Sequence, residues 1–270
     1  MTLPPVPDSF YWTAAPWGAA LRCRPLEALA PHLFTTRQLA LSSGDDYQEL
    51  ARGVGVDRVV TLTQVHGAAV LVVRQGAPVP QAPVEADVVV SDLAEVAVAV
   101  RAADCVPLLM ADRDTGAVAA VHAGWRGTAA RAAGAALTAM QREFGTRPAN
   151  LIVAIGPRIG RCCYQVGSEL VDAFAAAGHE RYLIDRWFST PASAVGFGEA
   201  GRSAFDARRR PPLRLDVAGA NRDQLILAGV PEAQIYDVGL CTAMHLEVLT
   251  SFRAEKENAG RMAGVIRCQE

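Results

Sequence analysis

Short apolar runs dominate the first half of the chain, and their length and many β-branched residues are typical of strands. Asp114-Thr115-Gly116 separates the last two runs, which predicts a hairpin turn. We therefore expect strands at Arg58 to Val65, Ala69 to Val73, Ala86 to Val90, Val96 to Ala102, Pro107 to Ala111 and Ala117 to His122.

Three later segments are typical of helices, because their apolar residues recur at helical spacing and capping residues flank two of them. Gly178 ends the second helix, and the third lies between Asp216 as N-cap and Gly229 as C-cap. The predicted helices are Thr128 to Phe144, Ser168 to Ala177 and Val217 to Ala228.

Strands and helices do not alternate regularly, which favours an α+β fold over a doubly wound nucleotide-binding fold. We expect a single domain over residues 1–270, with mixed β-sheets flanked by helices. The Pro-rich opening, Gln75 to Pro83 and Ser189 to Pro212 interrupt the apolar pattern and are interpreted as loops. The sequence contains neither standard Gly-rich phosphate loop.

Composition and charge indicate which kinds of partner the protein has. Half of the 270 residues are hydrophobic, and the formal net charge is only −2. The basic residues are scattered apart from Arg208-Arg209-Arg210, so we expect no nucleic-acid partner. The sequence has no apolar run long enough for a membrane span, and we expect no membrane partner and a cytoplasmic location.

Three candidate metal ligands lie at the ends of predicted strands. His66 lies in Gln64-Val65-His66-Gly67, Cys105 in Ala103-Asp104-Cys105-Val106-Pro107, and His122 in the segment from Val121 to Gly127. Two imidazoles and a thiolate suit zinc, and three protein ligands leave a fourth position open, as in catalytic zinc sites. Taken singly, each residue is more often structural, since buried Cys and satisfied core His are common.

Read in order, these segments resemble the YfiH/laccase-domain family, also called the polyphenol oxidase or purine nucleoside phosphorylase family. The resemblance continues through Ile155-Gly156-Pro157, Cys162-Cys163-Tyr164, Asp216 to Arg222, and Gly260 to Ile266. It covers the chain from about Phe34 to Ile266. It implies a YfiH-like fold with zinc on His66, Cys105 and His122, and copper is a possible occupant of the same site.

The resemblance also implies the substrates. Family members phosphorolyse adenosine, inosine and S-methyl-5'-thioadenosine, and deaminate adenosine, so purine nucleosides and phosphate are the expected partners. Phosphorolysis needs cations to hold the phosphate, and Arg37 and Arg126 are our candidates for that clamp. Asp104 is a candidate acid, base or orienting group, and Gln64 a candidate substrate contact. A structural role stays open for each of these residues.

Two segments depart from the family pattern. Thr35-Thr36-Arg37 is followed by Gln38 to Ser43 where the family usually has a Gly-Gly-Val-Ser segment, and Ala243 to Ala254 lacks a further Cys and a second Arg. Substrate contacts from these two loops therefore do not transfer from the family to this chain.

Three alternatives remain open at this point. A cysteine hydrolase would use Cys162 or Cys163 as nucleophile with His66 or His122 as base. A multicopper oxidase needs on the order of ten histidines, whereas the chain has five; copper at the single site would leave only adventitious phenol oxidation. A non-enzymatic zinc protein would need a fourth protein ligand.

Overall fold

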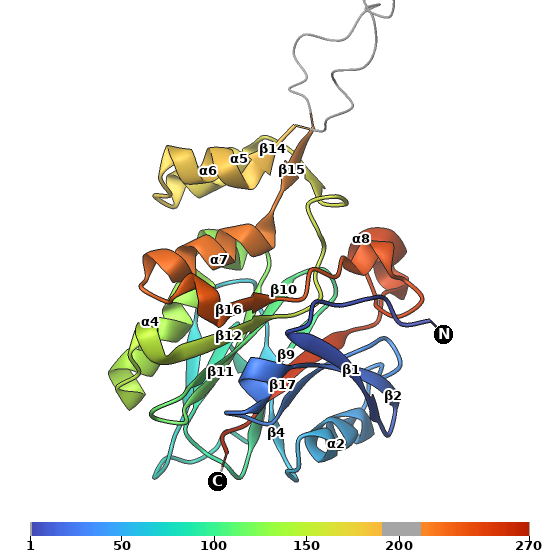
Figure 1. Ribbon diagram of the computed structural model, residues 1–270, viewed down its shortest axis with the longest axis vertical. Coiled ribbons are helices and arrows are strands. Elements are labelled where there is room, and N and C mark those ends of the chain that lie inside the picture. The colour runs from blue at the N-terminus through green and yellow to red at the C-terminus, as the bar shows by residue number, and fades with distance from the viewer. Residues whose placement is uncertain (1, 191–211, 270) are drawn as a thin grey trace, which may run out of the picture.

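Two six-stranded sheets form the body of the molecule (Figure 1). The computed structural model describes residues 2–190 and 212–269. The strands of the first sheet, in spatial order, are β1 (Phe10–Ala15), β2 (Gly18–Cys23), β3 (His32–Thr35), β17 (Met262–Ile266), β9 (Ala97–Ala102) and β4 (Val59–Val60). Those of the second sheet are β16 (Ile235–Asp237), β12 (Leu151–Ile155), β10 (Val106–Asp112), β11 (Val118–Ala123), β8 (Val88–Ser91) and β6 (Val70–Val73).

Smaller elements complete the fold. The short strands are β5 (Leu62–Thr63) with β7 (Val84–Glu85), and β13 (Gln165–Val166) and β14 (Phe188–Ser189) on either side of β15 (Leu213–Leu215). The α-helices are α1 (Arg24–Glu27), α2 (Gly44–Gly53), α3 (Trp125–Ala129), α4 (Ala132–Phe144), α5 (Glu169–Ala176), α6 (Arg181–Trp187), α7 (Val217–Leu227) and α8 (Phe252–Glu255). Within the described residues, 3₁₀ turns cover Pro148–Asn150, Glu232–Gln234, Thr242–Met244 and Lys256–Asn258.

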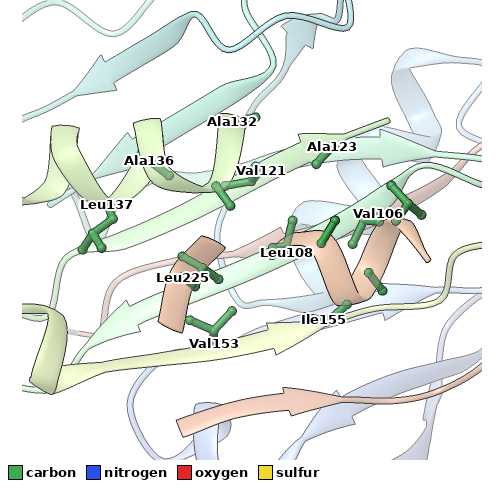
Figure 2. Packing of buried hydrophobic residues seen from close by; sticks show 14 of the residues in the cluster. Val106, Leu108, Val121, Ala123, Ala132, Ala136, Leu137, Val153, Ile155 and Leu225 are labelled. Carbon is green, nitrogen blue, oxygen red and sulfur yellow. The ribbon is translucent and has the colours of Figure 1, made fainter. Parts of the chain in front are cut away.

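The two large sheets pack face to face, and helices cover the outer faces. One apolar cluster joins Phe34 and Val100 of the first sheet to Leu109 and Ala120 of the second. The other face of the second sheet packs against α4 and α7, as the labelled side chains in Figure 2 show. Every residue of β10 and β11 is buried, which explains why both read as unbroken apolar runs.

The predicted fold class is confirmed, and so is the hairpin turn between β10 and β11, where Gly116 takes a positive φ of 72°. The predicted strand from Arg58 to Val65 is wrong in one respect. It divides at Thr61, because β4 pairs with β9 in the first sheet while β5 pairs with β7 in a separate two-stranded sheet. Most of the loop predicted from Ser189 to Pro212 lies outside the described residues.

The predicted helix from Thr128 to Phe144 is also wrong, because Arg131 has a φ of 60° and separates α3 from α4. Tertiary contacts hold this break. The Arg131 guanidinium donates to the carbonyls of Ala177 and Gly178, and the His179 ring bonds the carbonyl of Ala129 at 2.8 Å. These partners are distant in sequence, so helical periodicity carries no sign of them. Across the two described ranges, no helix has the length and apolar character needed to cross a membrane.

His32 is a fully buried hydrogen-bonding residue between the first sheet and α1. Its Nε2 accepts from the Cys23 amide at 2.9 Å, and its Nδ1 lies 2.9 Å from the Ala30 carbonyl, so the ring is a neutral Nδ1–H tautomer. Burial lowers the pKa of His32 to about 4. Protonation would remove the Nε2 acceptor and place an unpaired charge in the core.

This burial predicts acid sensitivity. The unfolded chain takes up the His32 proton near pH 6.5, whereas the native chain does so only near pH 4, so the contribution of His32 to stability is complete above pH 6.5 and falls as the pH falls. From pH 7 to pH 5 the loss is about 2 kcal/mol. Urea unfolding of wild type and His32→Gln at both pH values measures it. The variant should be less stable at pH 7 but lose less on acidification, whereas the control His245→Gln should keep the wild-type slope. Equal slopes in wild type and His32→Gln would contradict the assignment.

Candidate metal centre and its cavity

The three predicted ligands meet at one end of the second sheet. His66 lies in the loop after β5, Cys105 directly precedes β10, and His122 is near the end of β11. The antiparallel register of β10 and β11 pairs Val106 with Ala123, which brings Cys105 beside His122. The candidate ligand atoms of His66, Cys105 and His122 all lie within 4.8 Å of one another. The two imidazole rings meet edge to face, with centroids 4.9 Å apart.

Asp87, a fully buried carboxylate, holds two of the ligands in place. Its Oδ1 lies 2.8 Å from His122 Nδ1 and also accepts from the His66 amide at 2.9 Å. Its Oδ2 accepts from the Gly67 amide at 2.6 Å. The carboxylate thus fixes the His122 tautomer with Nδ1 as donor and leaves Nε2 for a metal, as orienting carboxylates do around metal-bound histidines. We did not single out Asp87 from the sequence.

Two residues of the site have backbone conformations that are unusual outside glycine. His66 has a φ of 62° and Asp104 a φ of 91°. Such conformations cost on the order of 1–3 kcal/mol and persist where surrounding contacts impose them. At His66 the contact is the hydrogen bond to Asp87, and at Asp104 the carbonyl accepts from the Ile159 amide at 2.9 Å. These two backbone conformations therefore lower the stability of the folded state while they fix the positions of His66 and Asp104 in the site.

The electrostatics favour a thiolate at Cys105. Burial by itself raises the pKa of this thiol, but hydrogen bonds and charge from His122 and His66 outweigh it and lower the pKa to about 7. Burial by itself lowers the pKa of His122, but Asp87 and Cys105 outweigh it and raise that pKa to about 9. The thiolate is the form of cysteine that ligates metals.

Gly124 leaves room for an ion at the cluster. A Cβ at this position would lie 2.7 Å from the Cys105 sulfur and 3.2 Å from Cδ2 of His66. Any side chain here would therefore force the ligands apart. The space, the ligand distances and the N₂S donor set fit a borderline-soft cation such as zinc or copper.

The cluster forms part of the wall of a cavity of about 540 Å³, a size typical of small-molecule sites. Aromatic and cationic side chains share that wall with the ligands. Besides His66, Cys105 and His122, the lining includes Gln64, Arg101, Asp104, Trp125, Tyr164, Phe252, Arg253 and Arg261.

Gln64 and Asp104 line the cavity, but their polar atoms are already engaged. The Gln64 amide donates to the Arg101 carbonyl and accepts from the Arg101 amide, both at 2.8 Å. The Asp104 carboxylate accepts from the Thr242 hydroxyl at 2.5 Å and from the Arg253 amide at 2.6 Å. These contacts make both residues part of the frame of the cavity.

Arg37 and Arg126 do not line the cavity in the described structure. Arg37 forms an ion pair with Glu255 at 2.9 Å, and Arg126 is exposed and stacks on Trp125 with 4.4 Å between its guanidinium carbon and the ring centroid. The clamp that we assigned to them from sequence is not supported by these positions.

Three other arginines line the cavity instead: Arg101, Arg253 and Arg261. Within residues 2–190 and 212–269, none of them forms an ion pair with a carboxylate. Arg261 belongs to a segment that resembles the family, so that resemblance was an available signal. Arg253 lies in the segment that departs from the family pattern, and only the tertiary fold brings it to the cavity.

Cys162 and Cys163 belong to a different cluster. Their sulfurs group with that of Cys241, whereas His66 and His122 group with Cys105. Burial raises the pKa of Cys163 to about 12 and also raises that of Cys162. An activated nucleophile requires the opposite shift and a nearby base. The cysteine hydrolase that we considered from sequence therefore finds no support in the described residues.

The fold and the site together define a mixed α/β protein with a candidate metal centre beside a small-molecule cavity. Residues 34–269 match the family described as multi-copper polyphenol oxidoreductase laccase, and the chain belongs to this family. The crystal structure of YlmD from Geobacillus stearothermophilus is similar, with a TM-score of 0.76 at 30% identity, covering 98% of this chain and 100% of that one. The resemblance seen in the sequence is thus confirmed.

Named relatives connect the family with purine nucleosides. Purine nucleoside phosphorylase YlmD of Geobacillus stearothermophilus is 31% identical over 252 residues, which are 88% of this chain and 85% of that protein. Adenosine deaminase RL5, from an unknown prokaryotic organism, is 33% identical over 222 residues, or 80% and 77% of the two chains. A purine nucleoside phosphorylase of Bacteroides thetaiotaomicron is 34% identical over 163 residues, 60% of this chain and 53% of that protein, so the match spans about half the length of that relative.

Asp87→Asn tests the orienting carboxylate. The amide cannot accept at both positions that the carboxylate serves, so the His122 ring should lose its fixed tautomer. We expect the affinity for added zinc to fall about 10- to 100-fold, as for other partners of metal-bound histidines. Competition with a chromophoric chelator measures this, and Asp114→Asn on the surface is the control. Unchanged affinity in Asp87→Asn would show that the carboxylate does not orient the ligand.

Gly124→Ala tests the space at the cluster. The added methyl group would lie against the Cys105 sulfur, so zinc binding should be lost or fall by more than tenfold while the fold is retained. Gly67→Ala is the matched control, because its Cβ would meet the nearest atom, an Asp87 carboxylate oxygen, at an ordinary 3.7 Å. Equal zinc binding by the two variants, measured by metal analysis, would contradict the predicted crowding.

Proposed function

We propose that this chain is a zinc-dependent purine nucleoside phosphorylase that also deaminates adenosine. One observation carries the proposal: the cluster of His66, Cys105 and His122 opens onto a cavity that is also lined by three arginines, none of which pairs with a carboxylate of the described residues. The names of the relatives supply the substrate class, purine nucleosides. Two imidazoles and a thiolate with an open fourth position suit a catalytic zinc ion.

His66, Cys105 and His122 would hold the zinc, and Asp87 would keep His122 in the ligating tautomer. When bound, zinc supplies Lewis-acid chemistry at the wall of the cavity. The protein residues then divide the remaining work. A phosphate nucleophile carries negative charge that must be held against the ribose, and cationic side chains supply that charge complement.

Arg253 and Arg261 are our candidates for the phosphate clamp, and Arg101 lines the same cavity. Asp104 acts as a positioning residue, because its carboxylate accepts the backbone amide of Arg253 and so fixes the start of α8. The Arg253 guanidinium lies 5.2 Å from the centroid of the Tyr164 ring and donates to the Gln165 carbonyl at 2.9 Å, so two contacts fix its position.

Tyr164 and Trp125 are our candidates for contact with the purine. Both line the cavity with aromatic rings that can stack on a base. Burial raises the pKa of Tyr164 to about 12, so its hydroxyl stays protonated and can donate to a ring nitrogen. This arrangement places the base and the phosphate on different side chains.

A multicopper centre does not fit the histidines of this chain. His32 bonds the backbone of Cys23, His179 bonds the carbonyl of Ala129, and His245 lies 3.8 Å from Glu247. Only His66 and His122 group as ligands, and the described cluster offers no fourth protein ligand that a closed structural zinc site would need. Copper bound in place of zinc would give at most weak phenol oxidation.

Cys105→Ala tests the role of the metal. We expect about one zinc per wild-type chain. Wild type should form adenine from adenosine only when phosphate is present, and should form inosine whether or not phosphate is present. The variant should lose both the zinc and both products, while the control His245→Ala keeps them. Metal analysis and chromatography of the products measure the outcome. Turnover that survives removal of zinc would overturn the proposal.

Arg253→Gln and Arg261→Gln test the phosphate clamp. Loss of a charge-assisted hydrogen bond should raise the KM for phosphate about tenfold or more, while deamination of adenosine, which uses no phosphate, stays within about twofold. Arg181→Gln is the control, since Arg181 is exposed, pairs with Asp185 and is not part of the cavity lining. A KM for phosphate that changes equally in all three variants would argue against the clamp.

A further inference from the structure

A second group of soft ligands lies outside the cavity lining. The sulfurs of Cys162, Cys163 and Cys241 are all within 4.8 Å of one another, and those of Cys162 and Cys163 are 3.6 Å apart. The reaction proposed above uses none of these thiols. The cysteines come from two segments almost eighty residues apart, so the tertiary fold brings them together.

The backbone is organised to make this meeting possible. A tight turn forms where the amides of Cys163 and Tyr164 both donate to the Gly160 carbonyl at 3.0 Å, which brings the vicinal pair back over Gly160. Arg158 forms a parallel bridge with Cys241, and its carbonyl accepts from the Thr242 amide at 3.0 Å. The two segments are therefore fixed side by side by backbone hydrogen bonds.

Gly160 allows the sulfurs to converge. A Cβ at this position would lie 3.2 Å from the Cys162 sulfur and 3.2 Å from Cβ of Cys241, so a side chain would crowd both cysteines. The Gly160 amide also donates to the Cys241 sulfur at 3.2 Å.

We propose that Cys162, Cys163 and Cys241 form a second metal site, a trithiolate that binds a soft cation, Cu(I). A metal–sulfur bond of about 2.3 Å places three sulfurs of a trigonal site about 4 Å apart, close to the spacing seen here. Among the described residues, the group contains no imidazole, no carboxylate and no fourth thiol. Thiolates select Cu(I), which accepts three sulfur ligands, whereas structural zinc sites are four-coordinate.

The three cysteines differ in burial, so the proposed site is open to solvent on one side and closed on the other. Cys162 is exposed, Cys163 is half-buried and Cys241 is buried. A cation would reach the exposed thiol first and be passed inward, and each thiol would release its proton on binding. Cys23, by contrast, is a buried core cysteine with no second thiol beside it among the described residues.

The site is connected to the wall of the cavity. Thr242 follows Cys241, and its hydroxyl donates to Asp104, the residue before Cys105. Loading of the trithiolate would therefore hold the segment around Cys241 against the turn at Gly160. An increase in the thermal unfolding temperature on addition of Cu(I) is the expected consequence.

Anaerobic Cu(I) titration of the zinc-loaded full chain tests the proposal, with bicinchoninate as competitor. Wild type should bind one Cu(I) without releasing zinc, and X-ray absorption should show three sulfurs at about 2.3 Å. Cys162→Ser, an exposed change that should not disturb folding, should weaken binding about 100-fold. Cys268→Ser, at a buried cysteine elsewhere, is the control and should bind as wild type does. The far-UV circular dichroism spectrum and the thermal unfolding temperature of each variant without Cu(I) report whether it is folded.

Three results would overturn the proposal. The first is Cu(I) affinity unchanged in Cys162→Ser and in Cys162→Ser/Cys163→Ser. The second is release of zinc with copper bound at Cys105, detected as loss of the extra Cu(I) in Cys105→Ala but not in Cys162→Ser. The third is a disulfide among the three cysteines that, once reduced, still binds no Cu(I). Because the readout is metal binding, absence of nucleoside turnover would contradict the proposed function without touching this site.

Discussion

The buried carboxylate of Asp87 is the interaction on which the site depends. It bonds the ring of His122 and the backbone amides of His66 and Gly67, so one side chain joins β11 to the loop after β5. Burial alone opposes the charge on Asp87, yet the hydrogen bonds with His122 and Gly67 lower its pKa. An uncompensated charge at this depth would be expensive, which ties the loop conformation to the ionised carboxylate. The unusual φ of His66 persists for the same reason.

The rest of the fold supplies rigidity behind that contact. β10 and β11 are buried on both faces, between the first sheet and the helices α4 and α7, so their ends cannot shift independently. Cys105 and His122 are attached to this packed body, whereas Arg253 and Arg261 come from the C-terminal segment around α8. Asp104 joins the two parts through its hydrogen bonds to Thr242 and Arg253. Two of the three candidate ligands, Cys105 and His122, thus lie at the ends of fixed strands. The candidate substrate contacts lie on a segment that is hydrogen-bonded to this body through Asp104.

The sequence indicates the candidate ligands more clearly than it indicates the residues around them. His66, Cys105 and His122 stand in short segments with a recognisable order, and the structure brings them together. Asp87 escaped notice because it lies in an apolar run that reads only as a strand, and its role depends on a loop twenty residues away. Arg126 was chosen because it adjoins a ligand motif, but α3 turns it outward onto Trp125. Proximity in sequence does not indicate which way a side chain points once a helix begins.

The two proposed reactions differ in the charge of the nucleophile, and the cavity reflects that difference. Water is neutral and needs activation, which the metal cluster supplies, and it makes no demand on distant cations. Phosphate carries its own negative charge and needs cations to hold it, and Arg253 and Arg261 line the same cavity as the cluster. In the proposed function, Arg253 and Arg261 therefore act on phosphorolysis alone, whereas the metal cluster serves both reactions.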